Sequence, residues 1–253
     1  MEEGAQPKSR WYQTWWGTTL AGFGGLVAAF IIVVAATTVS YWWQISHGDS
    51  KTLQERFGAG FTASTQGSGA AKIDRAKLET LDDPFLGRPG APIVIVEFVD
   101  FKCPNCKAAA PIIHQVADNY GSKVKIIVRD FPAESLHPGT TFFSQLAYCA
   151  GQQKHFWQMH DVFYNDQDTL PEALAPEDIK ALADRAGVDA AALSSCANSA
   201  EAVRKVKNNY FAGISFGVRG TPTFFINGEK VEGVISFEEW KRYLDNVSAT
   251  GGK

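Results

Sequence analysis

The chain has 253 residues, of which 45% are hydrophobic and 20% are charged, and its formal net charge at pH 7 is −3. This slightly acidic balance gives no electrostatic basis for binding nucleic acid, and the length suits a membrane anchor followed by one soluble domain. Four cysteines are more typical of a protein in an oxidising compartment than of a cytosolic protein.

An uncharged, apolar segment lies near the N-terminus. Residues 11–48 contain no Asp, Glu, Lys or Arg, and residues 20–39 alone would form a helix about 30 Å long, enough to span a bilayer. Aromatic residues flank it at the spacing of two membrane interfaces: Trp11, Tyr12, Trp15, Trp16, Tyr41, Trp42 and Trp43. A cleavable signal peptide is the alternative, but its apolar region should have only about 7–15 residues. We therefore expect a tail at residues 1–16 and a transmembrane anchor at residues 17–41.

The segment after the anchor, residues 42–85, is expected to form a flexible tether, because runs of small residues interrupt it. Within it, residues 50–57 and 73–81 are compatible with short helices. The soluble domain is expected at residues 86–248. Its first part predicts a strand at 93–99, a helix at 106–120 interrupted or kinked at Pro111, and a strand at 123–129.

The later part of the domain is predicted to be helical up to a final hairpin. Helical patterns cover residues 140–153, 155–164, 176–186, where Gly187 is a stop signal, and 190–211, which contains a break. Strands are expected at 223–226 and 230–234, joined by Asn227-Gly228, which is the strongest short hairpin signal. A last helix is expected at 237–247. Segments that contain strands therefore flank a helical one.

A Cys-x-x-Cys motif, Cys103-Pro104-Asn105-Cys106, lies where the first strand meets the following helix. The unpaired backbone N–H groups and the positive dipole end of a helix favour a thiolate over a thiol at this place. Cys103 is therefore predicted to be a nucleophile, and Cys106 is close enough to resolve a mixed disulfide formed on it. The chemistry that this arrangement predicts is thiol–disulfide exchange.

Two other interpretations of the motif are open. The cysteines could share a zinc ion with His155 and His160, although about 48 residues separate the two halves where a zinc finger has about 12–15. They could also be buried structural thiols. Lys102 and Lys107 disfavour that interpretation, because they flank the motif and indicate an exposed, electropositive junction.

Several spaced motifs resemble one family. Residues 87–106, which read GRPGAPIVIVEFVDFKCPNC, resemble the opening of the DsbA-like branch of the thioredoxin-fold oxidoreductases, the membrane-anchored or secreted disulfide oxidases of bacteria. The resemblance continues through VRDFP at 128–132, GTPTFFING at 220–228 and Gly233, and it covers about residues 82–247. It implies an α/β, thioredoxin-like fold with a helical insertion at about residues 137–210.

The resemblance also implies roles for residues around the cysteines. Pro222 matches the cis-proline loop of the family, which lies against the active cysteines, and the backbone of Thr221 would face a bound peptide. From the residues alone, a trans proline at a strand start is the ordinary interpretation. Pro104 and Asn105 would set how well the Cys103 thiolate is stabilised, and therefore the redox poise.

Glu97 is a charged residue in a strand that otherwise reads as apolar. Burial among Ile95, Val96 and Phe98 would raise the pKa of its carboxyl group and make it able to exchange protons with Cys106. The position matches the buried acid of the family. The alternatives are an edge-strand glutamate that faces solvent, or a salt bridge to Lys125 or Arg129 on the neighbouring strand. Asp100 is expected to cap the following helix.

Cys149 and Cys196 lie in separate predicted helices of the insertion. Some members of the family carry a second, structural disulfide, and a bond here would disfavour the unfolded chain by about 4 kcal/mol. Two buried free thiols are the alternative.

The expected function is an extracytoplasmic thiol:disulfide oxidoreductase that donates the Cys103–Cys106 disulfide to reduced, folding proteins. The same fold running as a reductase or isomerase is an alternative, and a metal-binding thioredoxin-like module is another. No cofactor, metal or nucleic acid is expected, and reoxidation is assigned to a quinone-linked membrane partner of the DsbB or vitamin K epoxide reductase type. Basic residues nearly balance across the anchor, so the expected orientation, a cytoplasmic N-terminus in a single-pass cell-membrane protein, follows from the function.

Overall fold

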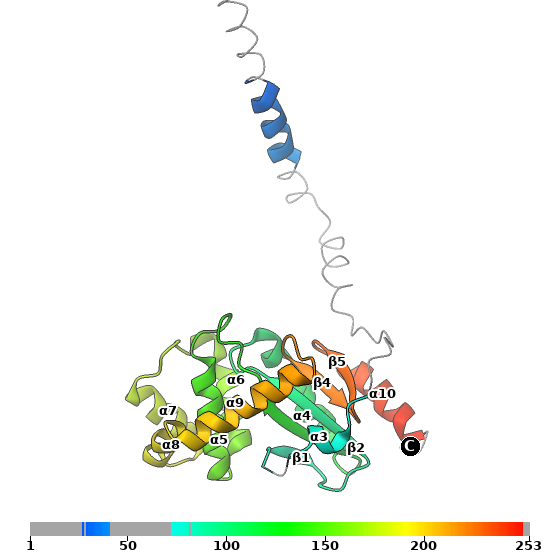
Figure 1. Ribbon diagram of the computed structural model, residues 1–253, viewed down its shortest axis with the longest axis vertical. Helices are drawn as coiled ribbons and strands as arrows, with labels where there is room; N and C mark the ends of the chain where they lie inside the picture. Colours follow the sequence, from blue (N-terminus) through cyan, green and yellow to red (C-terminus); the bar gives the residue numbers. More distant parts are fainter. Residues whose placement is uncertain (1–26, 28, 41–71, 81, 250–253) are drawn as a thin grey trace, which may run out of the picture. The chain divides into compact units, whose positions relative to one another are not determined.

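The computed structural model describes residue 27 and residues 29–40, 72–80 and 82–249 (Figure 1). The chain divides into two compact units, Met1–Gly60 and Phe61–Lys253. In the first unit, residues 29–40 are helical. Most of the expected anchor and tether lies outside the described residues, and within those residues no helix has the length and hydropathy needed to cross a membrane.

A five-stranded sheet in the order β1-β3-β2-β4-β5 forms the centre of the second unit. Its strands are β1 Phe85–Gly87, β2 Ile93–Val99, β3 Val124–Asp130, β4 Thr223–Ile226 and β5 Glu229–Glu232. β2 and β3 are parallel, whereas the other three pairs are antiparallel. All residues of β2 are buried, which explains its continuous apolar run, because a middle strand is covered on both faces.

Helix α4, Pro104–Tyr120, connects the parallel strands β2 and β3. It begins two residues earlier than expected, because a proline at the first helical position loses no hydrogen bond. The helix is continuous through Pro111, so the expected interruption is absent. This strand–helix–strand unit places the Cys-x-x-Cys motif at the carboxyl end of the central strand.

The helical insertion lies between β3 and β4. Figure 1 shows α5 to α8 beside the sheet and α9 crossing in front of it. The break expected within 190–211 is confirmed, because α8 ends at Ala197 and Ser199 caps the next helix by accepting a hydrogen bond from the backbone N–H of Ala202. Besides α4, the helices among the described residues of the second unit are α3 Arg75–Leu78, α5 Thr140–Gln152, α6 Phe156–Asp166, η2 Gln167–Thr169, α7 Pro176–Ala186, α8 Ala190–Ala197, α9 Ala200–Ser215 and α10 Phe237–Ala249.

Two apolar clusters on the α4 side of the structure hold the active-site region. One joins Phe101 and Cys106 to the insertion through Phe143 and Phe163. The other packs the sheet against α4 and α10, with Trp240 fully buried in it. The turn that carries the cysteines is therefore enclosed between the sheet and the insertion.

Cys149 on α5 and Cys196 on α8 form a disulfide with an S–S distance of 2.01 Å. The two residues are 47 positions apart in the sequence. In the chain-entropy view, a cross-link of this length disfavours the unfolded chain by about 4 kcal/mol. The bond therefore stabilises the insertion and leaves Cys103 and Cys106 as the free cysteines.

Candidate active site

Cys103 and Cys106 lie where β2 ends and α4 begins. Cys103 is the N-cap residue of α4, and its backbone N–H donates to the carbonyl oxygen of Asp100 at 3.1 Å. The exposed fraction is 6% for Cys103 and 1% for Cys106, so Cys103 is the more accessible thiol. Both thiols are nevertheless buried, and the expectation of an exposed junction was wrong.

The two lysines that flank the motif differ in whether their charge is balanced by a carboxylate. Lys107 forms an ion pair of 2.6 Å with Asp168, and Lys102 donates to the carbonyl oxygen of Pro138 at 2.9 Å. Lys107 is therefore neutralised by a carboxylate, whereas the positive charge of Lys102 is not balanced by an ion pair among the described residues.

The loop before β4 lies against Cys103. The Thr221–Pro222 peptide bond is cis, and the Sγ atom of Cys103 is 3.3 Å from the carbonyl oxygen of Thr221. The antiparallel pairing of Phe98 with Thr223 brings this loop to the end of β2. A peptide bound along the loop would meet the backbone of Thr221 beside the sulfur atom.

The two thiols differ strongly in acidity. The pKa of Cys103 is lowered to about 5, mainly because its sulfur accepts a hydrogen bond from the Cys106 thiol. The backbone N–H groups of Cys106 and Asn105 also lower this pKa, whereas burial raises it. Burial raises the pKa of Cys106 well above 9, and its hydrogen bond to Cys103 adds to this effect. At neutral pH the reduced pair therefore consists of a Cys103 thiolate and a Cys106 thiol. Pro104 and Asn105 are exposed between them.

Glu97 lies in the middle of β2 with an exposed fraction of 2%, in register with Val128 and Phe224. Its position on a central strand excludes the solvent-facing edge. Lys125 forms an ion pair with Glu79, and Arg129 forms one with Asp83, so the expected alternative of a salt bridge between Glu97 and either cation is absent. Burial raises the pKa of the Glu97 carboxyl group to about 8.

Side-chain alternation places Glu97 on the side of the sheet that α4 covers. Ile93 and Ile95, which share its face of β2, pack with Ala109 and Ile113 of α4. Tyr164 of α6 lies in the same apolar cluster as Cys106. Burial, followed by electrostatic interactions with Cys106 and Glu97, raises the pKa of its hydroxyl group. Glu97 and Cys106 therefore both influence the acidity of the Tyr164 hydroxyl group.

Asp100 is a site residue whose role differs from the expected helix cap, because Cys103 occupies that position without a side-chain cap. The fully buried carboxylate of Asp100 accepts hydrogen bonds from the backbone N–H of Lys102 and of Ala133, each at 2.8 Å, and contacts His137 Nδ1 at 2.8 Å. It therefore ties the turn before Cys103 to the segment that follows β3. An aspartate within an apolar run was the signal for such a role.

Gln167 was missed by sequence reasoning. Its side-chain amide donates to the carbonyl oxygens of Phe101 at 2.9 Å and Cys103 at 3.0 Å. This residue of η2 therefore holds the active-site turn from the insertion side. A glutamine at the end of a helical pattern carries no sequence signal that separates it from a solvated residue.

The zinc interpretation of the motif lacks a ligand set in the part of the chain that the structure describes. His155 Nδ1 contacts the carbonyl oxygen of Gln153 at 2.6 Å. The group of side chains close enough to share a metal ion is His114, His160 and Asp161, and it includes neither cysteine.

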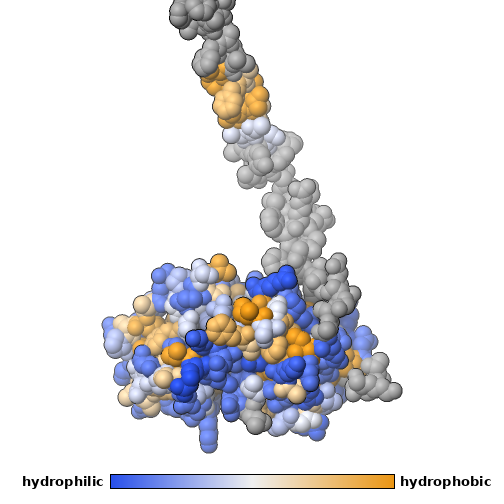
Figure 2. All heavy atoms as spheres, viewed as in Figure 1, coloured by the Kyte–Doolittle hydropathy of each residue, from blue (hydrophilic) through white to orange (hydrophobic). Residues whose placement is uncertain are grey.

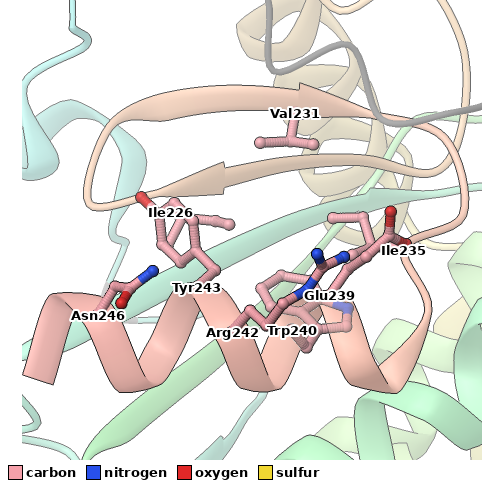
Figure 3. Close-up of a pocket in the computed structure, with 8 residues that line it drawn as sticks. All are labelled: Ile226, Val231, Ile235, Glu239, Trp240, Arg242, Tyr243 and Asn246. Atoms are coloured by element: carbon pink, nitrogen blue, oxygen red, sulfur yellow. The ribbon is translucent and has the colours of Figure 1, made fainter.

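Two hollows differ in their relation to the thiols. One, of about 330 Å³, lies between α10 and the β4–β5 hairpin and has no active-site residue in its lining (Figure 3). Its lining residues are Ile226, Val231, Ile235, Glu239, Trp240, Arg242, Tyr243 and Asn246. The other is a groove of about 800 Å³ along α9 and the segment after β3, and its lining includes Val218 and Arg219, shortly before Thr221. The groove therefore reaches the loop that contacts Cys103.

The first prediction concerns the acidity of Cys103. At pH 6 the reduced protein should react with iodoacetamide at Cys103 first, because a pKa of about 5 leaves this residue as the thiolate while Cys106 stays protonated. Peptide mass spectrometry across pH 4–8 measures the two rates. Cys103→Ser should abolish fast labelling, and faster labelling of Cys106 at pH 6 would reverse the assignment.

The second prediction concerns Glu97. Because the pKa of its carboxyl group is raised from 4.5 to about 8, the folded state binds more protons than the unfolded chain in this window, and stability falls as the pH rises through it. The Glu97→Gln variant should therefore be more stable than the wild type at pH 8. Its free energy of unfolding should also change less between pH 5 and pH 8 than that of the wild type. The family resemblance assigns Glu97 the role of proton carrier for Cys106, so thiol exchange by the variant should be about tenfold slower or more. Urea denaturation and stopped-flow exchange measure the two effects.

Glu79→Gln is the matched control for Glu97→Gln. Glu79 accepts from Lys125 at 2.9 Å, so this change removes a salt bridge, lowers stability modestly and leaves thiol exchange unchanged. Unchanged exchange in Glu97→Gln, together with reduced stability, would make Glu97 a structural residue only.

Comparison with known proteins places this site in a family. A thioredoxin family model matches residues 79–246. A thioredoxin-like oxidoreductase from Silicibacter pomeroyi DSS-3 has 22% sequence identity and a TM-score of 0.61, covering 70% of this chain and 99% of that one. The structure of α-DsbA1 from Wolbachia pipientis has 21% sequence identity and a TM-score of 0.61, covering 68% of this chain and 94% of that one. BdbD of Bacillus subtilis has 21% identity and a TM-score of 0.56, with 65% and 92% covered.

Curated relatives match over part of their length. Na(+)/H(+) antiporter NhaA 3 of Salinispora tropica is 31% identical over 156 residues, which is 62% of this chain and 23% of that protein. NhaA 1 of Salinispora arenicola is 32% identical over 157 residues, with the same coverage. The match thus spans about a quarter of the length of these relatives. Because the family model matches well over half of the chain, this protein belongs to the thioredoxin family, and its fold is that of the DsbA-like thiol–disulfide oxidoreductases.

Proposed function

We propose that this protein is an extracytoplasmic disulfide oxidase, which passes the Cys103–Cys106 disulfide to folding secreted or membrane proteins. The observation that carries the proposal is the opposite shift of the two thiol pKa values, with Cys103 at about 5 and Cys106 well above 9. Stabilising the Cys103 thiolate stabilises the reduced protein. A dithiol that is stable in its reduced form makes the corresponding disulfide a strong oxidant.

The reaction begins with a substrate thiolate, which attacks Sγ of Cys103 in the oxidised protein. The Cys103–Cys106 bond breaks, a mixed disulfide forms on Cys103, and the Cys106 sulfur takes up a proton. A second substrate thiolate then attacks the substrate sulfur of the mixed disulfide and releases Cys103 as a thiolate, a good leaving group because of its low pKa. The substrate loses two electrons and gains a disulfide, while the protein gains both electrons.

Glu97 supplies the proton in the first step. At neutral pH a carboxyl group with a pKa of about 8 is largely protonated, and it lies on the face of the sheet that α4 covers. Transfer of this proton to the Cys106 sulfur prevents a buried thiolate at Cys106, whose pKa is well above 9. In the reverse direction the Glu97 carboxylate takes the proton back, which makes Cys106 able to resolve the mixed disulfide.

The groove along α9 is the proposed binding surface for reduced chains. Large apolar side chains remain exposed in its lining, with exposed fractions of 76% for Leu136 and 55% for Phe211. Figure 2 shows hydrophobic residues near the C-terminal end of α9, which Figure 1 labels in the same view, and hydrophilic residues along the rest of this helix. Unfolded substrates expose apolar segments that complement such a surface, and the groove leads to the Thr221 loop beside Cys103.

The location outside the cytoplasm and the anchor are part of the proposal. The apolar length of residues 20–39 and the aromatic residues on both sides support a spanning helix. After each turnover the reduced Cys103–Cys106 pair must pass two electrons to another protein and become a disulfide again. An anchored domain is held near the proposed acceptor, a quinone-linked membrane partner of the DsbB or vitamin K epoxide reductase type. Fractionation with N-terminal sequencing tests this step, and a soluble product that begins near residue 41 contradicts it.

A redox titration tests the oxidase function. We expect the Cys103–Cys106 couple to have a potential well above the value of about −270 mV of thioredoxin, towards the value of about −120 mV of DsbA. Thiol trapping after equilibration with glutathione mixtures measures it. The Cys103→Ser/Cys106→Ser variant should show no transition in this range, which controls for the Cys149–Cys196 disulfide. A potential at or below that of thioredoxin would indicate a reductase instead.

Trapping of mixed disulfides tests the roles of the cysteines and the groove together. Cys106→Ser should accumulate mixed disulfides with unfolded proteins that carry a disulfide, because the Cys103 thiolate attacks one substrate sulfur, the other leaves as a thiolate, and the resolving thiol is missing. Cys103→Ser should accumulate none. Adding Phe211→Asp to the Cys106→Ser variant should lower the trapped yield severalfold. Asn208→Asp, which adds the same charge to α9 outside this groove, should not. Equal loss in both variants, seen on non-reducing gels, would remove the groove from the proposal.

A further inference from the structure

A cluster of two histidines and one aspartate joins α4 to α6 away from the thiol pair. His114 lies on α4, eight residues after Cys106, and His160 and Asp161 lie on α6. His114 Nε2 and His160 Nδ1 are each 2.8 Å from the same oxygen, Oδ1 of Asp161. The three ligand atoms all lie within 4.8 Å of one another. The thiol chemistry described above uses none of these side chains.

Two of the three separations between these atoms are close to those of a coordination shell. A zinc ion with Zn–N and Zn–O bonds of about 2.0–2.2 Å holds its ligand atoms about 3.0–3.5 Å apart. Two of the three separations are 2.8 Å, so these pairs need to open by only a few tenths of an ångström to admit an ion. Two imidazole nitrogens and one carboxylate oxygen are also a ligand set that zinc accepts, with water in the remaining position.

One of the three side chains is buried and tightly packed, whereas the other two are partly exposed to solvent. The His160 side chain is 2% exposed, and its ring packs against Trp157 and Tyr164 at centroid distances of 5.0 Å and 4.8 Å. His114 also contacts Trp157, at 5.7 Å. By contrast, the side chains of His114 and Asp161 are 34% and 46% exposed, which gives an ion a path of entry and a place for a water ligand. The buried histidine is thus held in place, while the other two ligands can adjust.

We propose that His114, His160 and Asp161 bind a zinc ion that cross-links the second half of α4 to α6. The ion replaces the direct contacts of both rings with the carboxylate. It therefore joins the helix that carries the cysteines to the insertion at a second place, beyond the contact of Lys107 with Asp168. Because the ligands are not thiols, this site is independent of the proposed oxidase function.

Calorimetric titration of the full chain with zinc chloride tests the site. The chain carries the Cys103→Ser and Cys106→Ser changes, so that no thiolate competes for the ion, and it has no histidine tag. We expect one zinc ion per chain, and an affinity at least tenfold lower after His114→Gln or Asp161→Asn. His155→Gln, which changes a histidine of the same region outside the cluster, should bind zinc as the parent protein does.

Thermal melts of the same proteins provide a second readout. Zinc should raise the melting temperature of the parent protein and of His155→Gln, and it should leave that of His114→Gln and Asp161→Asn unchanged. Both targeted side chains are partly exposed, and melts without zinc verify that the variants fold. Absence of saturable binding by the parent protein, or equal binding by all variants, would overturn the proposal.

Discussion

Burial of β2 on both faces is the constraint from which the geometry of the active site follows. As the middle strand, β2 pairs with β3 and β4, and its end determines where both neighbouring segments arrive. The pairing with β4 brings the Thr221 carbonyl to within 3.3 Å of Cys103 Sγ. The chain leaves the sheet at the same end and enters α4, whose first turn supplies N–H groups to the thiolate. The low pKa of Cys103 thus depends on where this strand ends.

The same strand separates two kinds of buried charge. On the face opposite Glu97, the buried guanidinium group of Arg129 lies 3.4 Å from the Asp83 carboxylate and donates to the side chain of Asn209. That network ties the segment before β1 to α9 and satisfies its charges, as stable buried ion pairs require. Glu97 faces α4 without such a partner among the described residues, and burial therefore raises its pKa to about 8. An unpaired acid costs stability, but it can change its protonation state at neutral pH.

The register between β2 and β3 decides whether Glu97 can form a salt bridge or remains an unpaired buried acid. Glu97 is in register with Val128, whereas Phe98 is in register with Arg129, and Lys125 is in register with Val94. Successive side chains of a strand point to opposite faces, so both candidate cations lie on the face away from Glu97. The sequence contained the alternation of β3, but the register between the strands was needed to choose between a salt bridge and an isolated acid.

The strand–helix–strand unit, the insertion and the final hairpin could be predicted because each has a local signal: an apolar run, a helical period or Asn227-Gly228. Contacts between distant segments had no such signal. Gln167 binds the carbonyl of Cys103 from 64 residues away, in a turn whose thiol is buried although it was expected to be exposed. The break between α8 and α9 at Ser199 is local, but a capping serine inside a long helical pattern did not determine its position.

These contacts between distant segments show that the helical insertion helps to position the active-site turn. Cys103 is held on one side by the Thr221 loop, which belongs to the sheet, and on the other by Gln167 of η2, which belongs to the insertion. Lys107 adds an ion pair to Asp168, the residue that follows Gln167. The sulfur and the backbone of Cys103 therefore contact both parts of the domain, at 3.3 Å from the Thr221 carbonyl oxygen and 3.0 Å from the Gln167 amide. The insertion is then part of the active site, because it positions the backbone on which the nucleophile is carried.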